Sequence, residues 1–273
     1  EKGVFPPPAE AAPEKSQETP HAEHKKRPSG EALEAVSKRV LNVLTTDNGT
    51  NLTAIVGRLQ FSSEYRDRRD GAVQLETVGR VDIPLSKRVL LRMDVPYLWL
   101  DPNVSGSSAV SGLSDVSVRL GGLVWQRPGF TFLAGADVII PTAIDTDLGR
   151  GKYLLGPGVA ANIPISALNS VLFPVIQHLV SVGGDPSRND LSYTRFRAEL
   201  TTPWSQNWWT AVEPTLIADW TQHAKTAMNL EFEAGRRLGE HYRVWARPAV
   251  GLWGTGVPGA YDWYMQVGIR YMF

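Results

Sequence analysis

The chain has 273 residues, enough for one large domain or two ordinary ones, and its 28 basic residues balance its 28 acidic residues. This balance offers no obvious basic surface to a nucleic acid, and the lack of cysteine excludes a disulfide framework, a thiolate metal site and a catalytic cysteine. Because the chain starts at Glu1 without a basic-then-apolar leader, we expect a mature chain whose signal peptide has been removed.

The first 48 residues differ in composition from the rest of the chain. Residues 1–28 hold six of the 19 prolines and almost nothing apolar enough to pack, which predicts a disordered periplasmic arm. His21 and His24 lie in this arm, but two histidines in a flexible segment do not build a closed metal site. Residues 29–48 place apolar side chains on one helical face, which predicts a short amphipathic helix and linker, short enough to enter a barrel as a plug.

After Asn51 the apolar residues recur with period two, which is the side-chain alternation of β-strands. The pattern predicts twelve strands, in an all-β domain that spans residues 49–273. Their expected ranges are 51–66, 72–83, 88–100, 113–125, 130–143, 153–165, 171–182, 193–203, 208–221, 227–238, 242–253 and 261–273.

The connections between these strands alternate between long and short. Residues 101–112 form a long connection, for example, whereas residues 204–207 form a short one. Transmembrane barrels have short periplasmic turns and longer outer loops, so the alternation predicts a twelve-stranded antiparallel up-and-down barrel. An even number of strands places both the N-terminal arm and Phe273 on the short-turn, periplasmic side.

Charged residues share one face of most predicted strands, opposite a continuous apolar face. We predict that this face lines the lumen, because an outer face in lipid must be apolar. A solvated outer face of a soluble barrel would give the same alternation, and charges that pair across a plugged interior are a second alternative. The predicted lumen-lining residues are Arg80, Arg92, Asp94, Arg119, Arg195, Arg197, Glu199, Glu231, Glu233, Arg243, Arg247 and Arg270. Their mixed sign predicts a polar passage with weak net selectivity.

Aromatic residues gather at the predicted strand ends and favour the membrane interpretation. Girdles of aromatic side chains are expected at the two interfaces of a bilayer, whereas a soluble barrel has no reason to sort them to both rims. The predicted girdle comprises Trp99, Trp125, Trp204, Trp208, Trp220, Trp253, Trp263, Tyr271 and Phe273. Trp209 also flanks a short turn, and Trp245 is the one tryptophan in mid-strand, on the polar face.

Two stretches carry a resemblance to known families. The final strand, with Phe273 last and apolar residues at alternate positions before it, resembles the C-terminal strand by which the barrel-assembly machinery recognises bacterial outer-membrane proteins. Val-Asp-Ile-Pro-Leu-Ser at 81–86, Met-Asp-Val-Pro-Tyr at 93–97 and Gly-Leu-Ser-Asp-Val-Ser-Val-Arg at 112–119 resemble the outer-membrane family named for the meta-pathway of phenol degradation. The resemblance implies a transport-associated barrel in the bacterial outer membrane, in contact with its lipid.

The predicted function is a porin-like channel for passive diffusion of small solutes, aromatic or hydrophobic compounds among them. An alternative is an anchor whose N-terminal arm binds a periplasmic partner. A second alternative, an outer-membrane lipid hydrolase, needs a nucleophile and a base on the same face. His178 and Ser181 are three residues apart and therefore on opposite faces of one strand. We expect no enzyme, no cofactor and no metal site.

Overall fold

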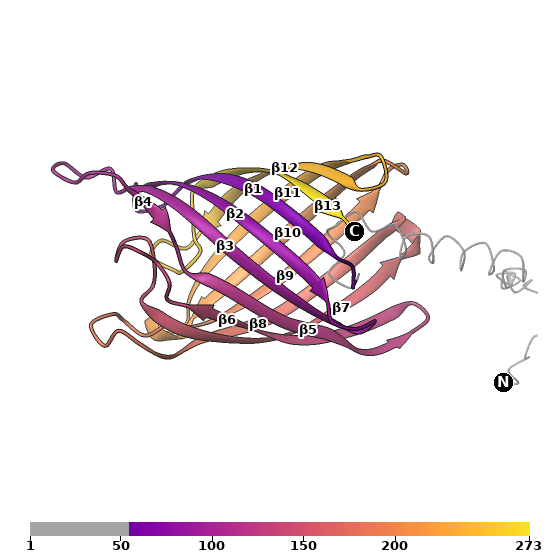
Figure 1. Cartoon of the computed structure of the whole chain (residues 1–273), viewed down its shortest axis with the longest axis horizontal. Coiled ribbons are helices and arrows are strands. Elements are labelled where there is room, and N and C mark those ends of the chain that lie inside the picture. The colour runs from indigo at the N-terminus through magenta and orange to yellow at the C-terminus, as the bar shows by residue number, and fades with distance from the viewer. Residues whose placement is uncertain (1–54) are drawn as a thin grey trace, which may run out of the picture.

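The computed structural model describes residues 55–273, which form a closed antiparallel β-barrel (Figure 1). The predicted arm at 1–28 and the predicted helix or plug at 29–48 lie outside the described residues. No helix in the described part of the chain has the length and apolar character needed to cross a membrane.

Thirteen strands and two short 3₁₀ helices follow one another in the described chain. The strands are β1 (Arg58–Asp67), β2 (Val73–Pro84), β3 (Val89–Asp101), β4 (Val110–Leu113), β5 (Val116–Arg127), β6 (Phe130–Ile140), β7 (Lys152–Ile165), β8 (Ser170–Gly184), β9 (Ser192–Pro203), β10 (Trp208–Asp219), β11 (Lys225–Leu238), β12 (Tyr242–Trp253) and β13 (Trp263–Met272). The helices are η1 (Ser166–Leu168) and η2 (Trp220–Gln222).

Apart from β4 and β5, each strand pairs with its neighbours in sequence, and β1 pairs with β13 to close the barrel. Both β4 and β5 pair with β3, β4 near one end and β5 near the other, so the thirteen strands fill twelve positions in the wall. The predicted number of wall positions is therefore confirmed. The prediction of one continuous strand at 113–125 is wrong, since the strand is interrupted at Ser114 and Asp115.

The interruption has a physical cause in the carboxylate of Asp115. This carboxylate accepts hydrogen bonds from the backbone N–H groups of Ala143 and Arg150, at 3.3 and 2.7 Å. The Ser114 hydroxyl in turn donates to the carbonyl of Leu148. Side chains that bond to backbone in this way compete with the ladder of a sheet. The break therefore ties the connection 141–151 to the wall.

Several predicted strand ends also differ from the observed ones. β1 begins at Arg58 rather than at residue 51, and β10 ends at Asp219 rather than at residue 221. The side chain of Asp219 accepts from the backbone N–H of Thr221, which starts η2 in place of further ladder bonds. Trp220 therefore lies in a 3₁₀ turn and not in a strand.

The two rims of the barrel differ as the loop lengths predict. Short turns at 85–88, 128–129, 166–169, 204–207 and 239–241 form one rim, and the longer connections form the other. The first described residues and Phe273 lie at the short-turn rim, where the backbone N–H of Phe273 donates to the carbonyl of Gly57. In Figure 1 the C-terminus lies at the end opposite the long β3–β4 connection.

Side chains alternate between a buried polar interior and an exposed apolar exterior. In β1, Arg58 is 1% exposed whereas Phe61 is 57% exposed, and in β13 Arg270 is 5% exposed whereas Val267 is 50% exposed. A water-soluble barrel would place its apolar face inward. The observed orientation is that of a barrel whose outer wall faces lipid.

Candidate functional site in the barrel interior

A cavity of about 840 Å³ occupies the interior and extends to the long-loop rim. Twelve arginines and seven acidic residues line it. The arginines are Arg58, Arg66, Arg68, Arg69, Arg80, Arg92, Arg119, Arg150, Arg195, Arg197, Arg247 and Arg270, and the acidic residues are Asp70, Glu76, Asp94, Asp115, Asp137, Asp147 and Glu199.

Cross-strand arginine–aspartate pairs stabilise one side of the wall. Arg92 donates to both oxygens of Asp82, at 2.7 and 2.9 Å, and Asp82 also accepts from Arg58. On the same two strands, Arg80 makes a bidentate contact with Asp94, at 2.6 and 2.8 Å. The partners in each bidentate pair face one another directly in the β2–β3 register. Paired, bidentate groups of this kind hold rigid side chains at fixed places in the wall.

Arg119 forms a third bidentate pair of this kind, with Asp137 on β6. Its Nη2 lies 2.6 Å from Asp137 Oδ2, which also accepts from the Gln177 amide at 2.8 Å. The pair thus links β5, β6 and β8.

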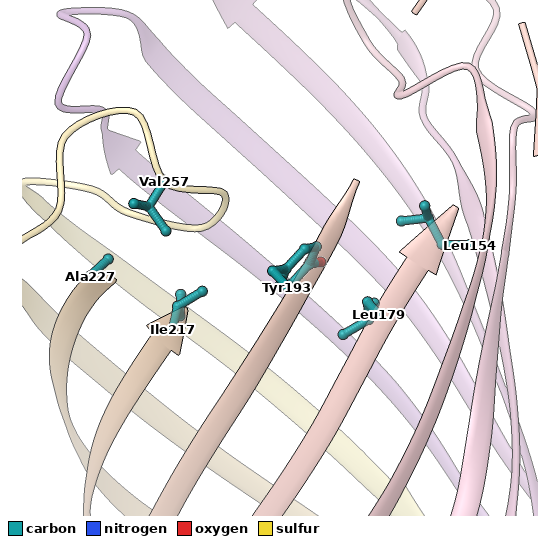
Figure 2. Close-up of a cluster of buried hydrophobic side chains, with 6 residues drawn as sticks. All are labelled: Leu154, Leu179, Tyr193, Ile217, Ala227 and Val257. Atoms are coloured by element: carbon teal, nitrogen blue, oxygen red, sulfur yellow. The ribbon is translucent and has the colours of Figure 1, made fainter. Parts of the chain in front are cut away.

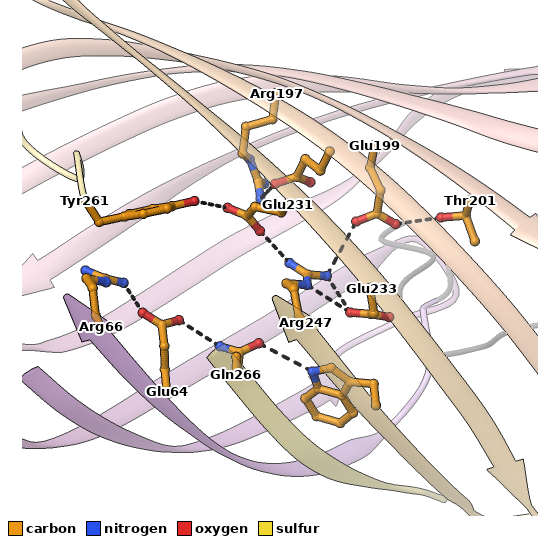
Figure 3. Close-up of polar contacts among 12 residues, drawn as sticks. Glu64, Arg66, Arg197, Glu199, Thr201, Glu231, Glu233, Arg247, Tyr261 and Gln266 are labelled. Carbon is orange, nitrogen blue, oxygen red and sulfur yellow. Dashed lines mark hydrogen bonds and ion pairs between the residues drawn. The ribbon is translucent and has the colours of Figure 1, made fainter. Parts of the chain in front are cut away.

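Arg247 is the centre of a second group of charges, on the side of the wall formed by β9 to β12 (Figure 3). Its guanidinium lies 2.6 Å from Glu233, 3.2 Å from Glu231 and 3.8 Å from Glu199. Glu233 is 1% exposed and also accepts from the indole of Trp209 at 2.8 Å. One guanidinium thus holds three carboxylates from two other strands in the barrel interior.

A chain of hydrogen bonds crosses the seam between β1 and β13. Glu64 accepts from Arg66 and from the Gln266 amide, the latter at 3.1 Å. The ring of Trp245 lies under the guanidinium of Arg270, 3.9 Å from ring centroid to Cζ, and Arg270 donates to Gln60 Oε1 at 2.6 Å. The closing strand is therefore joined to the first by side chains as well as by backbone.

Arg195 and Arg197 lie on the interior face of β9 with different partners. Arg197 is 3.4 Å from Glu213. Arg195 donates to the amide oxygen of Gln177 at 2.9 Å, and no carboxylate of residues 55–273 lies within ion-pair distance of it. Arg195 therefore contributes a positive charge to the cavity that no adjacent carboxylate balances.

Two long connections fold inward and narrow the long-loop rim. Val257, in the connection 254–262, packs on a row of buried side chains from five successive strands, Leu154, Leu179, Tyr193, Ile217 and Ala227 (Figure 2). Leu148, in the connection 141–151, is 2% exposed and packs in a separate cluster with Leu98 and Leu100. Each connection thus places one buried aliphatic side chain against the wall.

The predicted lumen-lining residues lie on the interior side of the wall. Nine of the twelve line the cavity: Arg80, Arg92, Asp94, Arg119, Arg195, Arg197, Glu199, Arg247 and Arg270. Glu231 and Glu233 lie against Arg247, and Arg243 lies at the short-turn rim, where it donates to the carbonyls of Glu240 and Tyr242. That these residues line a solute passage stays a prediction.

Other interior residues were not assigned a face from the sequence. Arg58, Glu64 and Arg66 come from the first strand, where the expected range 51–66 extends well before the observed start. Asp137 and Glu213 are the only charged residues of their strands before the rim. The two-residue period of each strand is therefore the signal that could have placed these two side chains on the inward face.

The residues of the predicted girdle lie on the outer side of the barrel. Seven tryptophans of the set and Phe273 are between 36% and 70% exposed. Arg127 and Arg236 lie over two of these rings, with Cζ 4.9 Å from the Trp125 centroid and 5.1 Å from the Trp208 centroid. Trp209 differs from its neighbour, since it is 3% exposed and faces inward toward Glu233. A membrane-interface role for the outer set stays a prediction.

Ser181 and His178 have separate partners. The Ser181 hydroxyl accepts from the backbone N–H of Leu191, and His178 Nδ1 lies 3.0 Å from Thr194 Oγ1 across β9. Within residues 55–273, no group of three or more histidine and acidic side chains is arranged to hold a metal ion.

Comparisons with known proteins give structural matches alone. Neither the family models nor the curated protein sequences include a match to the chain. Among solved structures, the NanC porin has a TM-score of 0.59 at 12% identity, over 79% of this chain and 100% of that chain. An outer-membrane channel from Pseudomonas putida F1 has a TM-score of 0.63 at 10% identity, over 80% and 94%. The KdgM porin in complex with a disordered oligogalacturonate has a TM-score of 0.54 at 6% identity, over 79% and 99%.

At these identities the similarity establishes the fold. The chain has the antiparallel β-barrel fold of these outer-membrane porins and channels, and the predicted outer-membrane location agrees with that fold.

Proposed function

We propose that the protein is an outer-membrane channel for passive diffusion of small solutes, with a preference for anions. The observation that carries this proposal is the cavity of about 840 Å³, on whose surface arginines outnumber acidic residues by five. The carboxylates that pair with these arginines, Glu64, Asp82, Glu213, Glu231 and Glu233, do not line the cavity. Charged side chains that line a pore set the potential that a permeating ion meets. The expectation of weak net selectivity stays a prediction, and the anion preference proposed here rests on the arginines that line the cavity.

Two further observations support a channel. The barrel fold is shared with porins and channels, one of which was solved with oligogalacturonate, a polyanion. Most of the charged pairs also lie along the wall between adjacent strands, and among residues 55–273 they leave a cavity in the interior.

The finer assignments rest on the sequence alone. Membership of the phenol-degradation family, and with it aromatic or hydrophobic solutes, is a hypothesis based on residues 81–119, and no family model supports it. The anchor alternative depends on the N-terminal arm, which lies outside the described residues. No contact of Ser181 or His178 favours the hydrolase alternative.

The reversal potential in a potassium chloride gradient across a planar bilayer tests the proposal. The reversal potential of wild-type protein should indicate that chloride permeates better than potassium. Arg195→Glu should shift the reversal potential toward the potassium equilibrium potential, because the substitution replaces a positive cavity charge that no adjacent carboxylate balances. Arg127→Glu makes the same charge change on the outer surface and should leave the potential unchanged. An electrically silent barrel that is correctly folded would exclude the channel, and a cation-selective wild type would exclude the anion preference.

A further inference from the structure

A second, smaller chamber of about 100 Å³ lies in the barrel interior toward the short-turn rim. Leu90, Leu133 and Phe173 line it, near the short-turn ends of β3, β6 and β8, and each is at most 9% exposed. Part of its wall is bare backbone, because Gly121 on β5 lies directly opposite Gly135 on β6. This chamber is apolar, in contrast to the larger cavity.

Four charged side chains line both the chamber and the large cavity, and so form the boundary between them. They are Arg92, Arg119, Asp137 and Arg197. Three guanidinium groups and one carboxylate are presented at this boundary, because Asp82 and Glu213, the partners of Arg92 and Arg197, do not line either cavity. A solute that moves from the large cavity into the chamber therefore passes a layer at which mainly guanidinium groups are presented, and then enters an apolar space.

This sequence of environments favours one class of solute. A carboxylate accepts strong charge-assisted hydrogen bonds from guanidinium groups. An apolar body gains free energy when it leaves water for the side chains of the chamber. A sugar acid would instead lose hydrogen bonds from its hydroxyls there, and a neutral apolar molecule would make no charged contact at the boundary.

We propose that the chamber binds small monocarboxylates with an apolar body, the carboxylate at Arg119 and Arg197 and the body against Leu133 and Phe173. The inference rests on the proposed channel function and adds a solute class to it. Permeating monocarboxylates of this class pause in the chamber and so block the chloride current.

The first test measures this block in planar bilayers with the full chain. Acetate, butyrate and hexanoate are added at constant ionic strength, and the half-blocking concentration is determined for each. It should fall roughly fourfold for each buried methylene. Hexanol, which has the same body without the charge, and gluconate, a polar anion, should each block no better than acetate.

Two substitutions change the chamber in opposite ways. Gly121→Ala fills it, because the added Cβ would meet only Ala134 O at 3.5 Å and Gly135 Cα at 3.7 Å, which are ordinary contacts. It should raise the half-blocking concentration of hexanoate, relative to the variant's own chloride current, by roughly fourfold. Phe173→Ala enlarges the chamber and should move the best blocker to a longer chain. Gly79→Ala is the matched control on the outer face, with its nearest contact at 3.9 Å, and should leave the block unchanged.

The outcomes separate this inference from the channel proposal. The chamber proposal is overturned, and the channel proposal stands, if the block of the chloride current does not depend on chain length. The same holds if the block depends on chain length but neither chamber substitution alters that dependence. If no current is seen, the channel proposal is wrong. Calorimetric titration of hexanoate into detergent-solubilised protein then tests the chamber proposal by itself. Binding weakened by Gly121→Ala but not by Gly79→Ala supports it, and no binding overturns it. Because the wild-type series and Phe173→Ala do not depend on Gly121, failure of one variant to fold does not remove the test.

Discussion

At the scale of single residues, charge pairs in the interior hold the wall and leave few positions where a charge can be changed without a cost in stability. Arg247 shows this best, since its guanidinium is the contact shared by Glu199, Glu231 and Glu233. From the sequence alone, replacement of Arg197 and Arg247 by Glu is expected to shift ion preference toward cations with little loss of folded protein. The structure changes this expectation, because the replacement of Arg247 would bring a fourth carboxylate among these three.

We therefore predict that Arg247→Gln destabilises the barrel by about 3 to 5 kcal/mol, the usual cost of leaving buried charges without their partner. Urea unfolding in lipid vesicles, followed by tryptophan fluorescence, measures this. Arg68→Gln is the control, since its pair with Asp70 is largely exposed and should contribute no more than about 1 kcal/mol. Equal stability of the two variants would contradict the central role of Arg247.

At the scale of elements, alternation in the sequence was enough to identify most strands and their faces, whereas contacts between distant residues were not predictable. The two-residue period places Arg119 and Asp137 on inward faces. Their pairing depends on the register between β5 and β6, which cannot be derived from the pattern of either strand alone. The break at Asp115 depends on backbone N–H groups at 143 and 150. Val257 lies in a glycine- and proline-rich connection, so the sequence alone indicates an ordinary exposed loop. Its burial depends on the cluster of side chains from β7 to β11, which only the structure shows.

The inward fold of connection 254–262 predicts a mobile constriction once its most buried aliphatic contact, Val257, is lost. Val257→Asp would place a charge against Ile217 and Tyr193, where it has no polar partner of its own, so the connection should leave the wall. Single-channel conductance should rise. Val104→Asp is the matched control, because Val104 is 62% exposed in another long connection. Unchanged conductance of the Val257 variant would show that the connection does not restrict the passage.

The outer wall gives a second prediction at this scale, which separates a lipid-facing from a water-facing strand. Val267 is 50% exposed in β13. Val267→Arg should destabilise a membrane barrel by about 2 to 4 kcal/mol if the residue lies near the bilayer midplane. Urea titration of vesicle-folded protein measures this, with Val104→Arg as the loop control. A water-facing strand would tolerate the arginine, so indistinguishable midpoints for the two variants would count against the lipid-facing wall.

At the scale of the whole molecule, the two unequal rims predict how the barrel sits in the outer membrane. Long connections belong on the outer side and short turns on the periplasmic side. In intact cells, a cysteine that replaces Ser107 should react with an impermeant maleimide, and one that replaces Asn207 should react only after the cells are opened. The native chain has no cysteine, so labelling has no background from the protein itself. The reverse pattern of labelling would mean the opposite orientation.

The seam between β1 and β13 bears on how the molecule folds. Gln266 bonds to Glu64 and Arg270 bonds to Gln60, across 202 and 210 positions of the chain. Contacts between residues so far apart in sequence require closure of a very long loop and slow the folding of a chain. The ladder from β1 to β13 can form between near neighbours, whereas the pairing of β1 with β13 has to wait for the last strand. Until then one edge of β1 and one edge of β13 are open, and an open strand edge is a template for pairing with another chain. The seam therefore makes closure the step at which this barrel is most exposed to aggregation during biogenesis.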